Sequence, residues 1–413
     1  MRFLRVLACG VVLIAGARFA SQCRAQSFGV ELHNTLMPAS GGMAGPSLAM
    51  PQDLQSAIYG NPATLTQYSG TQFSFGGAWV EPTYNVEQLT PLPAIGVDPY
   101  SAKSGLVGSA TPNIGVTQDL SELGLPATFG IGLFSNAGAG VDFRDVPESN
   151  GTSADYLALD IVFAAGMDLT DRLSLGAAFT LGNSYLDGPF VDLGGMTPAY
   201  GIRGTVGLNY EVGCDTTLGL YYQTKKAFQF DNAVLIGGQV FDVHMDHPEN
   251  FGFGVANKSL MDGRLLLAVD VLYNRYGDAD FYQAIWTDQW VFQTGAQYSL
   301  NRRTRLRLGY AYAQDCMRDN VGVSAGGVPF PAVTYIQSQF AAINPHRLTA
   351  GVGTRDVLPG IDLDLFAGGM FENTEQFGTT IASVQSYWVG AGLTWRFGRG
   401  CCERLPVPDS WSE

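Results

Sequence analysis

The stretch Tyr387-Trp-Val-Gly-Ala-Gly-Leu-Thr-Trp-Arg-Phe397 decides the fold, because an apolar side chain occupies every second position from Tyr387 to Phe397. The residues between them are mostly glycine or polar, as at Gly390, Thr394 and Arg396. A strand of period two places the two sets on opposite faces. The same alternation recurs in segment after segment from about residue 71 to residue 397, with turns that are alternately short and long. This pattern predicts an all-β fold, a transmembrane antiparallel β-barrel with lipid outside and polar groups inside.

The composition agrees with a lipid-facing β-surface. Charged residues make up 15% of the 413-residue chain, below the roughly 25% of soluble domains, and there are 52 glycines. The net charge of -14 argues against binding to nucleic acid, which requires a basic face. The acidic residues concentrate in turns and loops, where they give a solvated and repulsive exterior.

Residues 1–25 have the pattern of an export signal. Arg2 and Arg5 precede an apolar run over residues 6–17, which is too short to span a bilayer as a helix. No later stretch approaches eighteen apolar residues, and a membrane protein without such a helix is commonly a closed barrel. We therefore expect the chain in the outer membrane of a Gram-negative-type bacterium, among outer-membrane lipids. Its partners there would include the barrel-assembly machinery.

Four cysteines lie outside this signal, and their spacing matches no metal site. Cys214 and Cys316 should lie at opposite ends of the barrel, too far apart to bond. Pairing of Cys214 with the tail, which holds Cys401 and Cys402, stays open beside the alternative of unpaired thiols.

Alternation between turn signals predicts fourteen strands. Their expected ranges are 71–86, 105–118, 127–137, 154–168, 172–186, 199–213, 216–229, 248–260, 264–277, 288–300, 304–315, 345–356, 361–373 and 384–397. An even number of strands returns the C-terminus to the side where the barrel began. At about 3.3 Å per residue and a tilt of about 40°, such strands rise roughly 30 Å, enough for an apolar band of about 25 Å.

The connections give the orientation. Those after even-numbered strands are compact, as at 213–216 and 300–304, whereas the others are longer and reach their maximum at 316–344. Short turns on one side and long loops on the other are typical of outer-membrane barrels, with the short turns in the periplasm. Aromatic residues fall near the expected strand ends, where lipid headgroups lie: Trp290, Tyr298, Tyr310, Tyr312, Tyr387, Trp395 and Phe397.

Several inward positions carry polar or charged side chains. We expect these groups to be solvated in the lumen or paired across it, rather than to form a substrate path. They are Asp160, Asp270, Asp364, Gln293, Gln297 and Arg307.

Residues 26–69 do not alternate and precede the first strand. A fourteen-stranded barrel has an interior too wide for its own side chains to fill. The segment has low charge and many small apolar residues, unlike a solvated tail. We therefore expect it to form an N-terminal hatch inside the barrel of residues 70–397, with a flexible leader as the alternative. Residues 398–413 would be a periplasmic tail.

The stretch Ser56-Ala-Ile-Tyr-Gly-Asn-Pro-Ala-Thr-Leu65 resembles the hatch motif, built around Asn-Pro-Ala, of the FadL family. These proteins are outer-membrane transporters of long-chain fatty acids and related hydrophobic compounds. Residues 128–138, 268–280 and 288–298 add to the resemblance, which covers the mature chain to Phe397.

The resemblance implies that a hydrophobic small molecule is captured at extracellular loops and leaves sideways through a gap at a kinked third strand. In this sequence that strand is 127–137. Its glycines suit a bulge or a close approach of the backbone. Asn61-Pro62-Ala63 would contact the ligand or hold the hatch, with a purely structural turn as the alternative. The candidate residues on the third strand are Gly130, Gly132, Asn136 and Gly138.

Two features depart from the family pattern. Residues 398–413 follow the terminal aromatic, which puts in doubt how the assembly machinery reads the last strand. The loops 187–198 and 230–247 look shorter than the family's ligand-catching pair, although Val234, Leu235 and Ile236 would suit an apolar groove. Lys225 and Lys226 are candidates for a fatty carboxylate, but we expect them to extend along the surface at the membrane interface.

The sequence carries no sign of enzyme chemistry. It contains no Gly-x-Ser-x-Gly elbow, no phosphate-binding loop and no paired metal motif, so we expect neither an enzyme nor a cofactor. His346 is the single histidine that suits a catalytic rim. His244 and His247 have metal-like spacing, but we expect a solvated loop there.

These observations favour a monomeric channel for passive uptake of hydrophobic molecules. Two alternatives remain open at this point. One is a general porin for small polar solutes, which would conduct strongly even when the N-terminal segment is present. The other is a surface adhesin or structural barrel, whose deletion would leave uptake unchanged.

Overall fold

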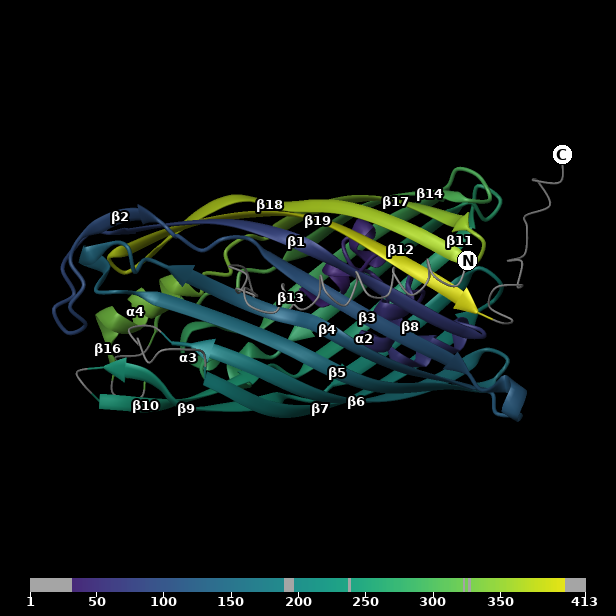
Figure 1. Ribbon diagram of the computed structural model, residues 1–413, viewed down its shortest axis with the longest axis horizontal. Coiled ribbons are helices and arrows are strands. Elements are labelled where there is room, and N and C mark those ends of the chain that lie inside the picture. Colours follow the sequence, from purple (N-terminus) through teal and green to yellow (C-terminus); the bar gives the residue numbers. More distant parts are fainter. Residues whose placement is uncertain (1–31, 189–196, 237–238, 322–323, 326–327, 398–413) are drawn as a thin grey trace, which may run out of the picture.

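A computed structural model describes residues 32–188, 197–236, 239–321, 324–325 and 328–397. Fourteen strands of this part close into one antiparallel barrel, because β19 pairs with β1 along its full length from Phe397↔Thr71 to Thr380↔Gln88. A short strand, β2 (Tyr100–Lys103), adds to the edge of β1. Figure 1 shows the strongly tilted strands and the long loops gathered at its left-hand end.

The barrel strands follow the chain in order around the ring, apart from the insertions in the long loops. They are β1 (Thr71–Gln88), β3 (Ser109–Asp119), β4 (Ala127–Asp142), β5 (Ser153–Thr170), β6 (Leu173–Asp187), β7 (Thr197–Val212), β8 (Thr216–Gln223), β11 (Asn250–Leu260), β12 (Leu265–Asn274), β13 (Gln289–Ser299), β14 (Thr304–Ala313), β17 (His346–Leu358), β18 (Ile361–Phe377) and β19 (Thr380–Phe397). The expected count of fourteen is therefore confirmed, as is the closed antiparallel architecture.

The outward face is apolar, as the alternation predicts. Phe75, Phe163 and Phe292 are each at least 40% exposed, although in water such side chains would be buried. On β19, Tyr387 and Val389 are exposed whereas Trp388 between them is 1% exposed. None of the described helices is long and apolar enough to span a membrane.

The two ends of the barrel differ. Turns such as 213–215, 300–303 and 359–360 form one end, called here the short-turn end. The other end, called here the long-loop end, carries most of the short helices and all of the extra strands that lie between barrel strands. The short helix η4 (Ser121–Leu123) is the exception, because it lies at the short-turn end. The elements of the long-loop end are β2, η5 (Pro147–Ser149), β9 (Lys226–Ile236), β10 (Gln239–His247), η6 (Tyr276–Asp278), α3 (Tyr282–Ile285), β15 (Ser324–Ala325), β16 (Val328–Pro329) and α4 (Phe330–Gln339).

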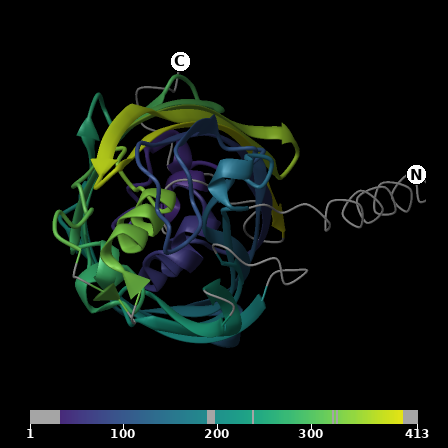
Figure 2. The ribbon, with the colours of Figure 1, turned by 90° about the vertical axis from the view of Figure 1, so that its left-hand side faces the viewer.

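Residues 32–69, called here the lumenal segment, lie inside the ring (Figure 2). They form η1 (His33–Leu36), η2 (Ser40–Met43), α2 (Leu54–Tyr59) and η3 (Pro62–Gln67). Asp53 caps α2 by accepting from the backbone N–H of Ser56 at 2.8 Å, and Asn61 caps η3 by accepting from Ala63 at 3.1 Å. Nearly every residue of the segment is buried, because the inner wall surrounds it.

Inner-face glycines allow this close fit. A Cβ at Gly207 of β7 would lie 1.9 Å from Asn61 Oδ1, and one at Gly176 of β6 would lie 2.2 Å from the Ala63 nitrogen. Both positions leave the wall backbone exposed to the segment, so a side chain there has no room. Comparable contacts come from strands around the ring, at Gly76, Gly115, Gly130, Gly166, Gly219, Gly254, Gly295, Gly309, Gly351 and Gly392.

The described cysteines are unpaired. Cys214 is exposed in the β7–β8 turn and Cys316 is buried at the long-loop end, so the expectation that they do not bond is confirmed. Burial raises the pKa of the Cys316 thiol well above its usual range. Cys401 and Cys402, like the signal and the tail, lie outside the described residues.

Several expected strands are shorter than the alternation suggested. The predicted strand 105–118 begins only at Ser109. The predicted strand 216–229 ends at Gln223, where the chain leaves the wall and enters the hairpin of β9 and β10. Residues 226–230 still alternate because Phe228 and Phe230 face a buried core rather than lipid. The predicted strand 264–277 likewise ends at Asn274, before η6.

Candidate functional site

The Asn61-Pro62-Ala63 turn joins the lumenal segment to the wall. The Asn61 amide donates to the carbonyl of Leu48 at 2.7 Å and to that of Leu208, on β7, at 3.0 Å. Pro62 occupies the first position of η3, where its missing N–H has no cost. All three residues are fully or nearly fully buried, packed against β5, β6 and β7. Their geometry is that of an anchor on the wall.

The two glycines near the start of β4 also face the lumenal segment. A Cβ at Gly130 would lie 2.9 Å from the Ile58 side chain, and one at Gly132 would lie 2.4 Å from the ring of Phe134. Phe134 is fully buried and its ring centroid lies 5.3 Å from that of Tyr59 in α2. These glycines therefore provide close approaches, while the bulge of the strand falls at Asn136, between Ser135 and Ala137.

Beyond this point the barrel wall loses its regular pairing. The β3–β4 ladder ends at Asn113↔Phe134, whereas β4 remains paired with β5 as far as Asp142↔Ser153. On the other side, β3 remains paired with β1 as far as Ser109↔Val80. Within the described chain, no ladder pair joins residues 136–141 to β3. Gly138 lies within this interrupted interval, called here the β3–β4 interruption.

Polar contacts close both ends of the β3–β4 interruption. At the inner end, the Ser135 N–H donates to Asn113 Oδ1 at 3.0 Å, and the Ser135 hydroxyl donates to the Pro112 carbonyl at 3.1 Å. At the outer end, the Gly105 N–H donates to the Asp142 carbonyl at 2.7 Å. The unpaired interval is therefore bounded at both ends, and the buried apolar side chains of Leu106 and Val141 lie beside it.

The remaining candidates lie elsewhere. Val234 is 9% exposed in β9 and stands with Ala233 at the long-loop end. The side chains of Leu235 and Ile236 lie outside the described residues. The structure thus gathers Asn61, Pro62, Ala63, Gly130 and Gly132 around the lumenal segment, with Asn136 and Gly138 just beyond them on β4. It leaves the β9 residues apart at the mouth.

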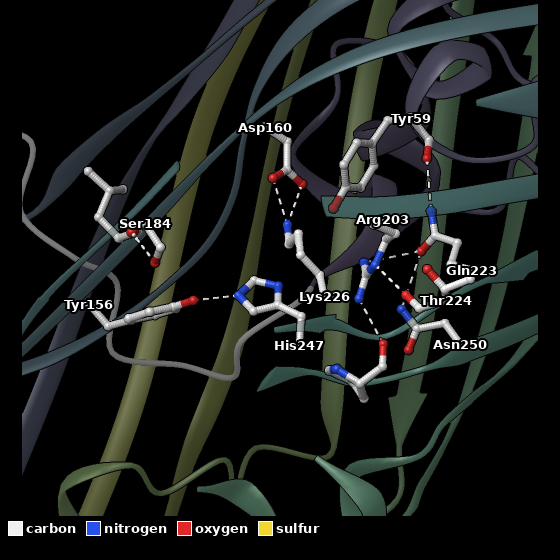
Figure 3. Close-up of polar contacts among 12 residues, drawn as sticks. Tyr59, Tyr156, Asp160, Ser184, Arg203, Gln223, Thr224, Lys226, His247 and Asn250 are labelled. Carbon is white, nitrogen blue, oxygen red and sulfur yellow. Dashed lines mark hydrogen bonds and ion pairs between the residues drawn. The ribbon is translucent and has the colours of Figure 1, made fainter. Parts of the chain in front are cut away.

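A buried polar cluster lies between these two regions (Figure 3). It includes Asp160, which was expected to be solvated in the lumen or paired across it. Lys226 Nζ lies 2.6 and 2.7 Å from the two carboxylate oxygens of Asp160, and both side chains are almost fully buried. The Tyr156 hydroxyl and His247 Nε2 are 2.5 Å apart. The predictions of a surface Lys226 and of a solvated loop at His247 are therefore wrong. The hairpin of β9 and β10 turns both side chains inward, onto partners of β5.

Arg203 of β7 stabilises the departure of this hairpin from the wall. Its guanidinium donates to the carbonyl of Thr224 at 2.8 Å, just after β8, and to that of Pro248 at 2.7 Å, just before β11. One side chain thereby joins the point where the chain leaves the wall to the point where it returns. Arg203 is 2% exposed, so these bonds satisfy a charge that burial would otherwise destabilise.

Above the polar cluster, the long-loop end holds a large apolar core rich in aromatic rings. Tyr276, Tyr282 and Trp286 pack with ring centroids 4.6 to 5.6 Å apart. Helix α4, drawn in green, lies inside the ring at this end (Figure 2). It is held by Tyr335, whose hydroxyl lies 2.7 Å from that of Tyr100 and 2.9 Å from that of Thr152.

Arg347 of β17 faces this core with an unusual lack of partners. Its side chain is 6% exposed, yet Nε and Nη1 are buried with no hydrogen bond among the described residues. The other charged groups predicted to face inward are all satisfied. Arg307 donates to Gln297 at 2.7 Å and to Asp364 at 2.5 Å, and Asp270 accepts from the backbone of Ser47 at 2.7 Å. No three His, Cys, Asp or Glu side chains in the described ranges converge as a metal site.

Comparison with solved structures settles the type of barrel. The P. putida toluene transporter TodX superposes with a TM-score of 0.65 at 18% identity, covering 89% of this chain and 99% of that one. The chain has the FadL/TodX-type fold. The Ralstonia pickettii toluene transporter TbuX gives a TM-score of 0.63 at 18% identity, covering 89% of this chain and 99% of that one. A Pseudomonas aeruginosa FadL homologue gives a TM-score of 0.64 at 13% identity, covering 90% of this chain and 100% of that one.

These comparisons confirm, at the level of the fold, the resemblance to the FadL family that the sequence shows. No protein-family model and no curated protein matched the chain. The identity to the named neighbours is low, whereas the barrel fold matches over about nine-tenths of the chain.

Proposed function

We propose that this chain is an outer-membrane channel for the passive uptake of hydrophobic molecules, such as long-chain fatty acids or similar compounds. Two of the named neighbours are toluene transporters and a third is a FadL homologue, which supports a hydrophobic cargo. The apolar outer face suits a lipid environment, with the short-turn end in the periplasm. Apolar solutes are held back by the polar surface layer outside, so a channel that delivers them to the lipid needs no aqueous crossing.

The observation that carries the proposal is the β3–β4 interruption. In lipid, unpaired backbone N–H and C=O groups are costly, so barrels normally pair every strand along its whole length. Here pairing stops beside Phe134 at the lumenal segment and resumes only at Asp142. In this proposal the unpaired interval beside Leu106 and Val141 opens and gives an apolar ligand a route from the lumen into the membrane.

In this proposal the lumenal segment is the hatch. It blocks the straight route to the periplasm, and its Tyr59 stands against Phe134 where the lateral route begins. The ligand is captured at the long-loop end, beside the buried aromatic core and α4. Asn61, Pro62 and Ala63 anchor the hatch on β5, β6 and β7, so that movement is confined to the side near β4.

We expect Gly138→Leu to reduce uptake of a radiolabelled fatty acid or of toluene, because the added side chain narrows the β3–β4 interruption. The matched control is Gly204→Leu on β7, where the nearest atom to an added Cβ is 3.8 Å away. Both variants should retain the electrophoretic shift on heating that marks a folded barrel.

Normal uptake by a folded Gly138→Leu variant would reject the lateral route while leaving the channel function standing. The proposed function itself fails if cells that express the native chain take up hydrophobic probes no faster than cells without it.

A variant of Arg347 tests whether the channel recognises an anionic ligand or only a neutral one. A buried guanidinium without a partner attracts a carboxylate, because an unpaired charge is strongly destabilised away from water. We expect Arg347→Gln to lower uptake of a long-chain carboxylate and to leave uptake of toluene unchanged. Equal effects on both probes would show that Arg347 has no part in recognising the headgroup.

A further inference from the structure

A cavity of about 160 Å³ lies at the short-turn end, between the lumenal segment and the wall. The segment contributes Gln52, Asp53 and Tyr68 to its lining. Strands β14, β17, β18 and β19 contribute the opposite side, where charged side chains are concentrated. These are Arg305, Arg307, Arg355, Asp362, Asp364 and Arg396.

The carboxylates of this cavity are fully engaged. Asp53 accepts three backbone N–H groups within the lumenal segment, from Ala39 at 3.0 Å and from Ser40 and Ser56 at 2.8 Å. Asp364 accepts from Arg307 at 2.5 Å. The Asp362 carboxylate lies 3.0 Å from Arg396 and also accepts from the backbone of Asp356.

Two guanidinium groups are left over. Arg305 and Arg355 have no side-chain hydrogen bond or ion pair with any described residue. They lie on neighbouring strands and face the same cavity, since Arg305 is paired with Gly353, two residues from Arg355. The Nε atoms of Arg355 and Arg396 are moreover buried without an acceptor. Unmatched positive charge and unsatisfied donors therefore converge on one cavity.

Apart from Asp53, whose carboxylate is already engaged, the lumenal segment supplies no counter-charge. The Tyr68 hydroxyl donates to the carbonyl of Pro51 at 3.0 Å, and the Gln52 amide donates to that of Met50 at 2.9 Å. A ligand that satisfies the cavity must therefore be an acceptor that carries negative charge. Guanidinium groups bind planar and tetrahedral oxyanions through paired N–H donors, which fits this geometry.

We propose that this cavity binds a small free oxyanion such as phosphate, with Arg305 and Arg355 as its principal ligands. The volume corresponds to about five water molecules at roughly 30 Å³ each, which is enough for one phosphate together with a few water molecules. The cavity lies on the inner side of the wall, so the bound oxyanion comes from the aqueous phase and is not a lipid headgroup. This site is independent of hydrophobic transport, since it lies at the other end of the barrel from the aromatic core.

The test is isothermal titration calorimetry of inorganic phosphate into the full chain in detergent, at constant ionic strength in chloride. We expect saturable binding to the native protein, weakened about tenfold or more in Arg305→Gln/Arg355→Gln, since charged hydrogen bonds are lost. Arg303→Gln is the matched control. It removes a positive charge from an exposed position of the adjacent turn and should bind phosphate like the native protein.

Retention of the heat-dependent electrophoretic shift verifies that each variant is folded. The absence of saturable phosphate binding to the native chain would overturn the proposal, and so would equal binding by all three proteins. A second titration uses dihexanoyl-phosphatidylglycerol. Binding of this lipid without binding of phosphate would also overturn the proposal, because it would assign the arginines to a membrane headgroup.

Discussion

Removing residues 32–69 should turn a nearly closed barrel into an open, porin-like pore. Barrels of 16–18 strands leave an aqueous channel, whereas eight strands are filled by their own side chains, so a ring of fourteen needs a separate filling. Here the lumenal segment provides it, packed directly on the wall backbone at the inner-face glycines. We expect single-channel conductance in planar bilayers to be small for the native chain and large after the deletion.

A point variant tests the same idea without removing any chain. In Gly207→Leu, the new Cβ would lie 1.9 Å from Asn61 Oδ1. Because this distance is too short, the Asn61 side chain must move away from β7. Gly204→Leu, three residues away on the same strand, has free space and should conduct like the native protein. A large steady conductance in the native chain would instead favour a general porin. An unchanged conductance in both the deletion and Gly207→Leu would show that the segment does not block the lumen.

The sequence predicted the ring of strands well because the alternation reports directly on an apolar outer face. It failed at residues 224–230 for the same reason. Phe228 and Phe230 continue the period of two, but their apolar side is covered by protein instead of lipid. A period-two pattern indicates that one face of a strand is apolar, but it does not indicate whether lipid or protein covers that face. The departure from the wall becomes visible only through Arg203, whose two carbonyl partners lie 21 and 45 residues along the chain.

The candidate site was predicted only in part, since its key features depend on register. The Asn-Pro-Ala turn has a local signature, with a side-chain cap and a proline at the first position of η3. The β3–β4 interruption has none, because it is a loss of pairing between two strands that each look regular. Lys226 and His247 look like solvated residues because their partners, Asp160 and Tyr156, are 66 and 91 residues away in sequence.

The buried pair formed by Lys226 and Asp160 should dominate the stability of the long-loop half of the barrel. The Lys226 stem packs over β6 and β7, where added Cβ atoms at Gly182 and Gly201 would lie 2.9 and 3.1 Å from it. Water cannot replace either partner, since the two side chains are 0% and 1% exposed. We therefore expect Lys226→Met to destabilise the fold by about 3–5 kcal/mol, because it leaves the Asp160 carboxylate buried and unpaired.

The measurement is the free energy of unfolding from guanidinium titrations of the chain in detergent or lipid, followed by tryptophan fluorescence. Arg144→Gln is the matched control, because Arg144 forms an ion pair of 2.7 Å with Asp142 but is 51% exposed, and such pairs contribute about 0–1 kcal/mol. The double variant Lys226→Met/Asp160→Leu removes both charges and should recover most of the loss. If Lys226→Met were no more destabilising than Arg144→Gln, water would have to reach Asp160. The polar cluster would then be part of an open aqueous lumen, which the hydrophobic channel proposed here does not contain.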